Sequence, residues 1–138
     1  MVKLLNLGVT RVSRVQIPSG PFTMHNLEDW LIKLKTSNKL ILVEGKKDKK
    51  ALEEFDIYNI ITIDKPIYQL VEEISLNGKE CILLVDLDKE GKKLYSKIKH
   101  DLQKHGVNVD SKFREFLFKH TKLANIEGLK TYVRNSRM

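Results

Sequence analysis

Short apolar runs alternate with amphipathic segments through most of the chain. The runs at 40–45, 58–63 and 81–85 are rich in aliphatic residues and bounded by polar ones, which is typical of buried strands. In the segments between and after them, apolar residues recur every three or four positions, which indicates helices packed on a sheet. This alternation predicts an α/β protein with a parallel sheet, whose fourth strand is expected at 107–109.

Helices are expected to flank these strands. The first should begin after Asn26, a residue that can cap a helix, and should place Trp30 on its apolar face. At that spacing Trp30 is expected to lie in the core, although its ring could instead stack on a base. The longest helix carries six lysines between 89 and 104 and is closed by Gly106. Two further helices are expected after Ser111 and after Gly128.

The first 23 residues do not follow this pattern, since they show no helical or strand period and contain closely spaced proline and glycine. Residues 14–18 can be back-translated to contain GTTCAAATCC, which is typical of the T-loop of a transfer RNA gene. We therefore interpret residues 1–23 as the translation of an adjacent gene, with the native start at Met24. The alternative is a basic arm that contacts nucleic acid. In both cases residues 24–138 are expected to form one domain.

The composition indicates a cytoplasmic protein with a polyanionic partner. Of the 138 residues, 41% are apolar and 31% are charged, and no signal peptide or membrane-spanning run is visible. The only cysteine, Cys81, excludes an internal disulfide and is expected to be a small buried side chain at the start of a strand. The net charge of +7 favours contact with nucleic acid phosphates and gives no reason to expect a membrane partner.

Two of the predicted strands end in acidic residues. Glu44 follows the first strand, and Asp86 and Asp88 follow the third. Because parallel strands present their carboxyl ends at one edge of the sheet, these three carboxylates are expected to meet there. Side chains two residues apart point the same way on a strand, and a divalent cation such as Mg²⁺ relieves the repulsion between them. Alternatively, acids in this position cap the helix that follows.

These motifs resemble those of the Toprim domain. This domain is shared by topoisomerases, bacterial-type primases, small nucleases and the ribonuclease that matures 5S ribosomal RNA. The resemblance lies in VEG at 43–45 and DLDKEG at 86–91, and it extends over about residues 39–129. VEGKKD, which ends at Asp48, is most similar to the maturase and to small stand-alone archaeal and bacterial members. Leu87 departs from the proline or glycine of many primases and maturases, which leaves the nuclease-like subtype open.

The resemblance implies a Toprim (Rossmann-like) fold, with four parallel strands in the order 2-1-3-4, an added amino-terminal helix and added carboxyl-terminal helices. It also implies that Asp86 and Asp88 bind Mg²⁺ or Mn²⁺. Glu44 would act as a general acid or base, or as a further ligand. Glu90 would be a weaker ligand, and its alternative role is a favourable negative charge in the first turn of a helix. Catalysis is therefore expected to depend on Glu44, Asp86 and Asp88.

Lysines are expected to form a basic rim around this acidic centre. They are placed at the starts of the two helices that follow the acids, at Lys46, Lys47, Lys89, Lys92 and Lys93. Lysines position a phosphodiester backbone, while the metal meets the reacting phosphate. Alternatively, most of these lysines are solvated helix surface.

The expected function is that of a metal-dependent nuclease that acts on structured RNA, as in ribosomal RNA maturation. The chain is too short for the additional domains that topoisomerases and primases require. RNA is favoured over DNA, and a ribosomal or repair-type protein is a further expected partner. The alternative is a nucleic-acid-binding accessory subunit whose acidic centre binds metal without catalysis, because the chain lacks the additional carboxyl-terminal region of the maturase.

Overall fold

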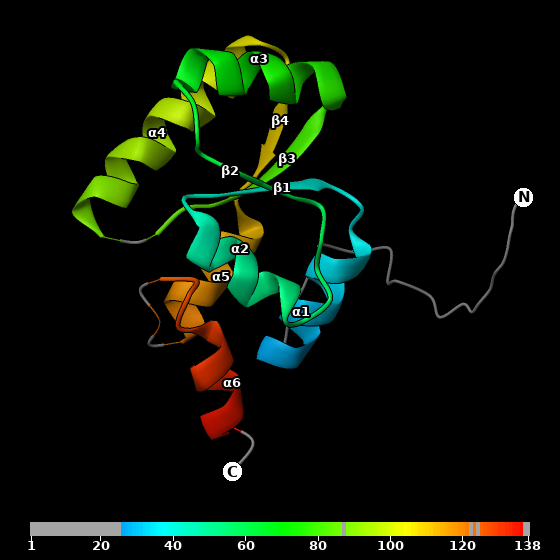
Figure 1. Ribbon diagram of the computed structural model, residues 1–138, viewed down its shortest axis with the longest axis vertical. Helices are drawn as coiled ribbons and strands as arrows, with labels where there is room; N and C mark the ends of the chain where they lie inside the picture. The colour runs from blue at the N-terminus through cyan, green and yellow to red at the C-terminus, as the bar shows by residue number, and fades with distance from the viewer. Residues whose placement is uncertain (1–25, 87, 122, 124, 137–138) are drawn as a thin grey trace, which may run out of the picture.

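A four-stranded parallel sheet forms the middle layer of the protein (Figure 1). The computed structural model describes residues 26–136 with the exception of 87, 122 and 124. The strands are β1 (Leu40–Val43), β2 (Ile60–Thr62), β3 (Glu80–Leu84) and β4 (Asn108–Asp110), in the order β2-β1-β3-β4. The predicted α/β class and the predicted strand order are confirmed.

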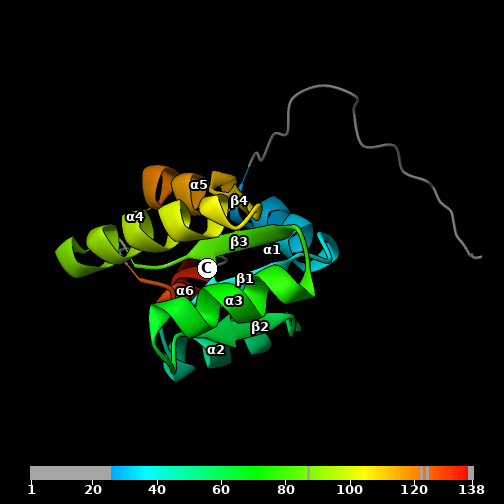
Figure 2. The ribbon, with the colours of Figure 1, turned by 90° about the horizontal axis from the view of Figure 1, so that it is seen from above.

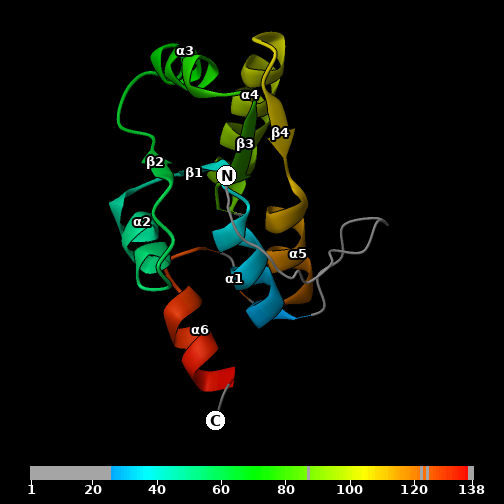
Figure 3. The same ribbon diagram turned by 90° about the vertical axis from the view of Figure 1, so that its right-hand side faces the viewer.

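Helices cover both faces of this sheet. They are α1 (Leu27–Thr36), α2 (Lys46–Glu53), α3 (Ile67–Asn77), α4 (Lys89–Lys104), α5 (Lys112–His120) and α6 (Leu129–Ser136). In Figures 1 and 3, α3 and α4 lie on one side of the sheet and the other four helices on the opposite side. Figure 2 shows the sheet from the side that α3 and α4 cover, and these two helices extend over the strands.

The alternation of side chains along the central strands builds a hydrophobic core on each face. Ile41 and Val43 of β1 face the cluster formed with α1, α2, α5 and α6, whereas Leu42 faces the cluster formed with α3 and α4. The predicted first helix is confirmed, because the Asn26 side chain accepts a hydrogen bond from the Asp29 N–H (2.7 Å). Both central strands are therefore buried on both sides, as their continuous apolar runs predict.

Trp30 lies fully in the core, as its spacing predicts. Its indole Nε1 donates a hydrogen bond to the Phe113 carbonyl (2.8 Å), and the two rings meet edge to face with centroids 6.1 Å apart. This contact joins α1 to α5. Cys81 is buried in β3, as predicted. Gly106 follows the end of α4 and has a φ of +80°, a conformation that favours glycine.

The edge strands are shorter than or displaced from the predicted ones. β2 spans Ile60–Thr62 rather than 58–63, because β1 pairs with only these three residues of the edge strand. The fourth strand lies at Asn108–Asp110, one residue later than predicted. The interpretation of residues 1–23 falls outside the described residues. No helix in the described part of the chain is long and apolar enough to span a membrane.

Candidate functional site

The carboxyl ends of β1 and β3 bring Glu44 and Asp86 together. β1 and β3 pair in parallel up to Val43 and Leu84, so the chain leaves both strands at the same edge of the sheet. The Glu44 Oε1 accepts a hydrogen bond from the backbone N–H of Asp86 (2.8 Å). This bond spans 42 positions of sequence and fixes the first acid against the turn that carries the second.

Asp48 is a further acid at this edge, to which the sequence analysis assigned no role. It lies in the first turn of α2, is 5% exposed, and its Oδ2 accepts a hydrogen bond from the Gly45 N–H (3.0 Å). Burial is the largest cause that raises the pKa of Asp48, and the charge of Glu44 adds to it. Its spacing from Ala51 and Leu52, which places it on the buried face of the helix, was the signal in the sequence.

Asp86 has the most perturbed environment among the site acids. Its Oδ1 is buried and has no hydrogen-bond partner among the described residues, while the backbone N–H of Ile126 donates to the carboxyl group. Burial, followed by the charges of Asp48 and Glu44, raises the pKa of Asp86 to about 7. The Asp86 carboxyl therefore holds its proton to a higher pH than an ordinary aspartate does.

Asp88 is turned toward the helix that follows it. It is the N-cap residue of α4, and its Oδ1 accepts a hydrogen bond from the Gly91 N–H (2.7 Å). Because β3 ends at Leu84, the strand geometry that would aim Asp86 and Asp88 the same way does not extend to Asp88. Its charge is the smallest of the causes given for the raised pKa of Asp86. One of the two Asp88 carboxylate oxygens thus caps α4, as the alternative interpretation of this residue predicted.

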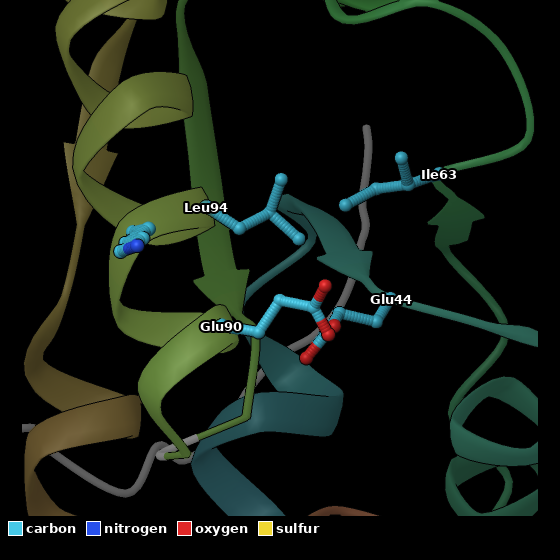
Figure 4. Close-up of a pocket in the computed structure, with 5 residues that line it drawn as sticks. Glu44, Ile63, Glu90 and Leu94 are labelled. Carbon is cyan, nitrogen blue, oxygen red and sulfur yellow. The ribbon is translucent and has the colours of Figure 1, made fainter.

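Glu90 extends toward Glu44 across an open pocket. The pocket has a volume of about 550 Å³ and is lined by Glu44, Ile63, Glu90, Lys93 and Leu94. Figure 4 shows the Glu90 side chain, from the first turn of α4, reaching toward the Glu44 carboxylate at the end of β1. Two aliphatic side chains complete the wall, so the pocket combines acidic, basic and apolar surface.

The predicted basic residues lie at the starts of α2 and α4. Lys93 lines the pocket beside the acids. The other four lysines are exposed at the beginnings of these helices, at Lys46, Lys47, Lys89 and Lys92. Their ammonium groups are available to phosphates, and the same exposure is expected of ordinary solvated lysines.

Arg114, on α5, is a site residue that the sequence analysis missed. Its Nε donates to the Val85 carbonyl (3.0 Å) and its Nη2 donates to the Asp86 carbonyl (3.1 Å). The residue is 9% exposed, and burial lowers the pKa of its guanidinium. Its neighbours Phe113 and Leu117 mark the buried side of the helix, which was the available signal.

The anchored acids suit Mg²⁺ better than a cation that needs a complete cage of protein ligands. Glu44, Asp48 and Asp88 each use one oxygen to accept a backbone N–H, which leaves the second oxygen free of that bond. Within the described residues, no three His, Cys, Asp or Glu side chains form a group that could hold a metal ion. Mg²⁺ keeps several waters and needs only one or two carboxylates, and the Asp86 Oδ1, which has no hydrogen-bond partner among the described residues, has the chemistry of such a ligand.

A parallel 2-1-3-4 sheet with a glutamate after its first strand and an Asp-x-Asp motif after its third defines the Toprim class of proteins. The model of the Toprim domain matches residues 39–123, and the chain belongs to this family. Membership implies a metal-dependent function related to nucleic acids, and Toprim domains generally bind Mg²⁺.

Within this class, the chain is similar to the small UPF0292 proteins. It is 34% identical to a UPF0292 protein of Methanocaldococcus jannaschii, over 78% of this chain and 87% of that protein. A UPF0292 protein of Thermoplasma volcanium is 33% identical, over 69% of this chain and 82% of that protein. A solved structure of a protein from Aquifex aeolicus is 39% identical, with a TM-score of 0.71, and covers 75% of this chain and 98% of its own. The predicted stand-alone Toprim family is confirmed.

Proposed function

We propose that the chain is a Mg²⁺-dependent nuclease that acts on structured RNA. The observation that carries the proposal is the meeting of Glu44, Asp48 and Asp86 at one sheet edge, where burial and then the charges of the other two acids raise the pKa of Asp86 to about 7. A centre that holds negative charge at such a cost is typical of functional sites. RNA is favoured because VEGKKD resembles the maturase of 5S ribosomal RNA, and a ribosomal or repair-type protein is the proposed partner.

The site residues divide into groups that bind a cation and groups that handle protons or phosphates. Mg²⁺ would neutralise charge on phosphoryl oxygens and lower the pKa of a bound water. Asp86 and Asp88 would hold it, with Glu90 as a weaker ligand. Glu44, which faces the pocket, would accept or donate a proton, and its bond to the Asp86 N–H keeps it oriented. Lys93, on the pocket wall, would contact the phosphate backbone.

A second candidate is a nucleic-acid-binding accessory subunit without catalysis. It is favoured by the capping role of Asp88, whose Oδ1 is committed to the Gly91 N–H. It is also favoured by the lack, within the described part of the chain, of three side chains grouped to hold a metal directly. In that role the acids would bind a cation structurally, and the lysines would supply the affinity for nucleic acid.

Cleavage of labelled structured RNA, single-stranded DNA and double-stranded DNA, with Mg²⁺ or Mn²⁺, tests both candidates. The variants are Asp86→Asn and Glu44→Gln, and the matched control is Glu72→Gln, which changes an exposed acid of α3. We expect wild type and the control to cleave RNA, and both site variants to bind RNA without cleaving it. Binding without cleavage by wild type would instead favour the accessory subunit, and equal cleavage by all four proteins would refute a role for the site.

A further inference from the structure

Arg114 is a buried cation beside the acidic centre, and it lies outside the motifs at 43–45 and 86–91. Its guanidinium carbon lies 4.3 Å from the centre of the Tyr95 ring and 5.6 Å from that of Phe118. Burial of a guanidinium is costly unless its N–H groups are bonded and its charge is balanced. Two of its N–H groups bond to backbone carbonyls next to the acidic centre, and the charges of Asp86 and Glu44 favour its charged form.

The Arg114 hydrogen bonds hold the backbone directly after β3. The strand ends at Leu84, and the carbonyls of the next two residues, Val85 and Asp86, accept bonds from Nε and Nη2. A planar guanidinium presents two N–H groups in a fixed fork, so it can hold two neighbouring acceptors at once, which an ammonium cannot do with the same geometry. Arg114 therefore supplies hydrogen-bond donors to the first two carbonyls after the strand.

The same turn is also confined by α4. A Cβ added at Gly91 would lie 2.2 Å from the Asp86 carbonyl oxygen, so the first turn of α4 packs directly on this peptide. The Asp86 carbonyl thus meets both the first turn of α4 and the Arg114 guanidinium, and the Asp86 N–H is bonded to Glu44. With the peptide held at both ends, the direction of the Asp86 side chain is also determined.

We propose that Arg114 is a positioning residue of the acidic centre, which fixes the 85–86 turn and so holds the Asp86 carboxyl in place to bind a divalent cation. Its charge also interacts favourably with the charges of Asp86 and Glu44. This inference rests on the proposed metal-binding function for the identity of the ligand. The fixing of the turn is independent of any metal and can be measured separately.

The test uses Arg114→Met, Arg114→Lys and, as a control, Phe118→Leu in the full chain. Arg114→Met keeps an unbranched stem but loses the charge and both bonds, and Arg114→Lys keeps the charge without the fork. Phe118→Leu removes packing around the guanidinium without changing the groups that bond to the two carbonyls. Urea unfolding identifies how much each change destabilises the whole protein, so that effects on the site can be compared at known stability.

The first readout is amide hydrogen exchange in EDTA, comparing the Asp86 N–H with that of Ile82 in the middle of β3. In Arg114→Met we expect the protection of Asp86 to fall at least tenfold relative to Ile82, while Phe118→Leu changes both amides by the same factor. The second readout is the Kd for Mg²⁺ by titration calorimetry. We expect it to rise at least tenfold in Arg114→Met, to rise less in Arg114→Lys, and to change less than twofold in Phe118→Leu.

An Asp86 amide that stays as protected as Ile82 in Arg114→Met would overturn the proposal. So would a Mg²⁺ affinity that falls equally in Arg114→Met and Phe118→Leu. If wild type binds Mg²⁺ but cleaves no nucleic acid, the nuclease function fails while the assignment of Arg114 stands. If wild type binds no Mg²⁺, the metal-binding role of Arg114 fails, and the exchange data alone report whether it fixes the turn.

Discussion

Replacement of Asp86 by asparagine is expected to stabilise the metal-free protein while it removes the response to Mg²⁺. The Asp86 Oδ1 is buried without a hydrogen-bond partner among the described residues, and the charges of Asp48 and Glu44 oppose its ionisation. An asparagine carries no charge, and its amide N–H groups can donate to these neighbouring carboxylates. The substitution therefore removes an unfavourable interaction that only a bound cation offsets.

The size of the effect follows from the raised pKa of Asp86. A pKa of about 7, compared with the ordinary value of 3.8, corresponds to about 4 kcal/mol of destabilisation at pH 8 for a fully desolvated group. Asp86 as a residue is only partly buried, and solvent screens part of the repulsion, so we expect about 1–2 kcal/mol. Because the folded state holds this proton more tightly than the unfolded state, the free energy of unfolding falls as the pH rises from about 4 to about 7.

Urea unfolding in EDTA at pH 5, 6, 7 and 8 measures this dependence. Wild type should lose stability over this range, whereas Asp86→Asn should lose less, and the residual slope should come from Asp48, whose pKa is also raised. Addition of Mg²⁺ at 100 times its Kd should stabilise wild type by about 2.7 kcal/mol and the variant by much less. A variant at pH 8 that is no more stable than wild type in EDTA would refute the electrostatic reasoning.

Three further predictions concern single residues around the site. Gly91→Ala should destabilise the protein by about 1–3 kcal/mol, because the added Cβ would lie 2.2 Å from the Asp86 carbonyl oxygen. Gly45→Ala should be tolerated, since no neighbouring atom would lie closer than 4.0 Å to its Cβ. The urea unfolding midpoints of the two variants test this difference. Asp88→Ala should cost about 1 kcal/mol through loss of the α4 cap, and Asp88→Asn should keep that stability in the same assay. Burial raises the pKa of the Cys81 thiol to about 12, so the thiol of the native protein should resist alkylation by iodoacetamide at pH 8. Mass spectrometry measures the rate of alkylation, and a rate equal to that of the unfolded chain would contradict this prediction.

The architecture could be predicted from the sequence because each of its central features has a local signature. The strands β1 and β3 are continuous apolar runs, since helices cover both of their faces, and the acids after them mark where they end. Asn26 and Gly106 mark a helix start and a helix end through their own conformations. The predicted limits of the edge strands β2 and β4 were less accurate, because the length of an edge strand depends on how many of its residues pair with the neighbouring strand.

The electrostatics of the site could be predicted only in part. Glu44, Asp86 and Asp88 were all expected to meet, since parallel strands end at one edge. The structure joins Glu44 to Asp86, whereas the conformation of Asp88 depends on where β3 stops and α4 begins. Arg114 bonds to residues 28 and 29 positions away, and no periodic pattern along the chain encodes such a contact. The assignment of catalytic and metal-binding roles to these acids remains a prediction, which the variants above test.

The carboxyl-terminal segment belongs to the site as well as to the core. The Toprim match ends at residue 123, yet the backbone N–H groups of Ile126 and Glu127 donate to the carboxyls of Asp86 and Asp48. Ile126 is fully buried in the cluster that α6 completes, so the packing of its side chain determines where these two N–H groups lie. Backbone N–H groups carry partial positive charge and cannot be deleted by substitution of a side chain. It follows that changes in the packing of α6 should reach the acids through the backbone at Ile126.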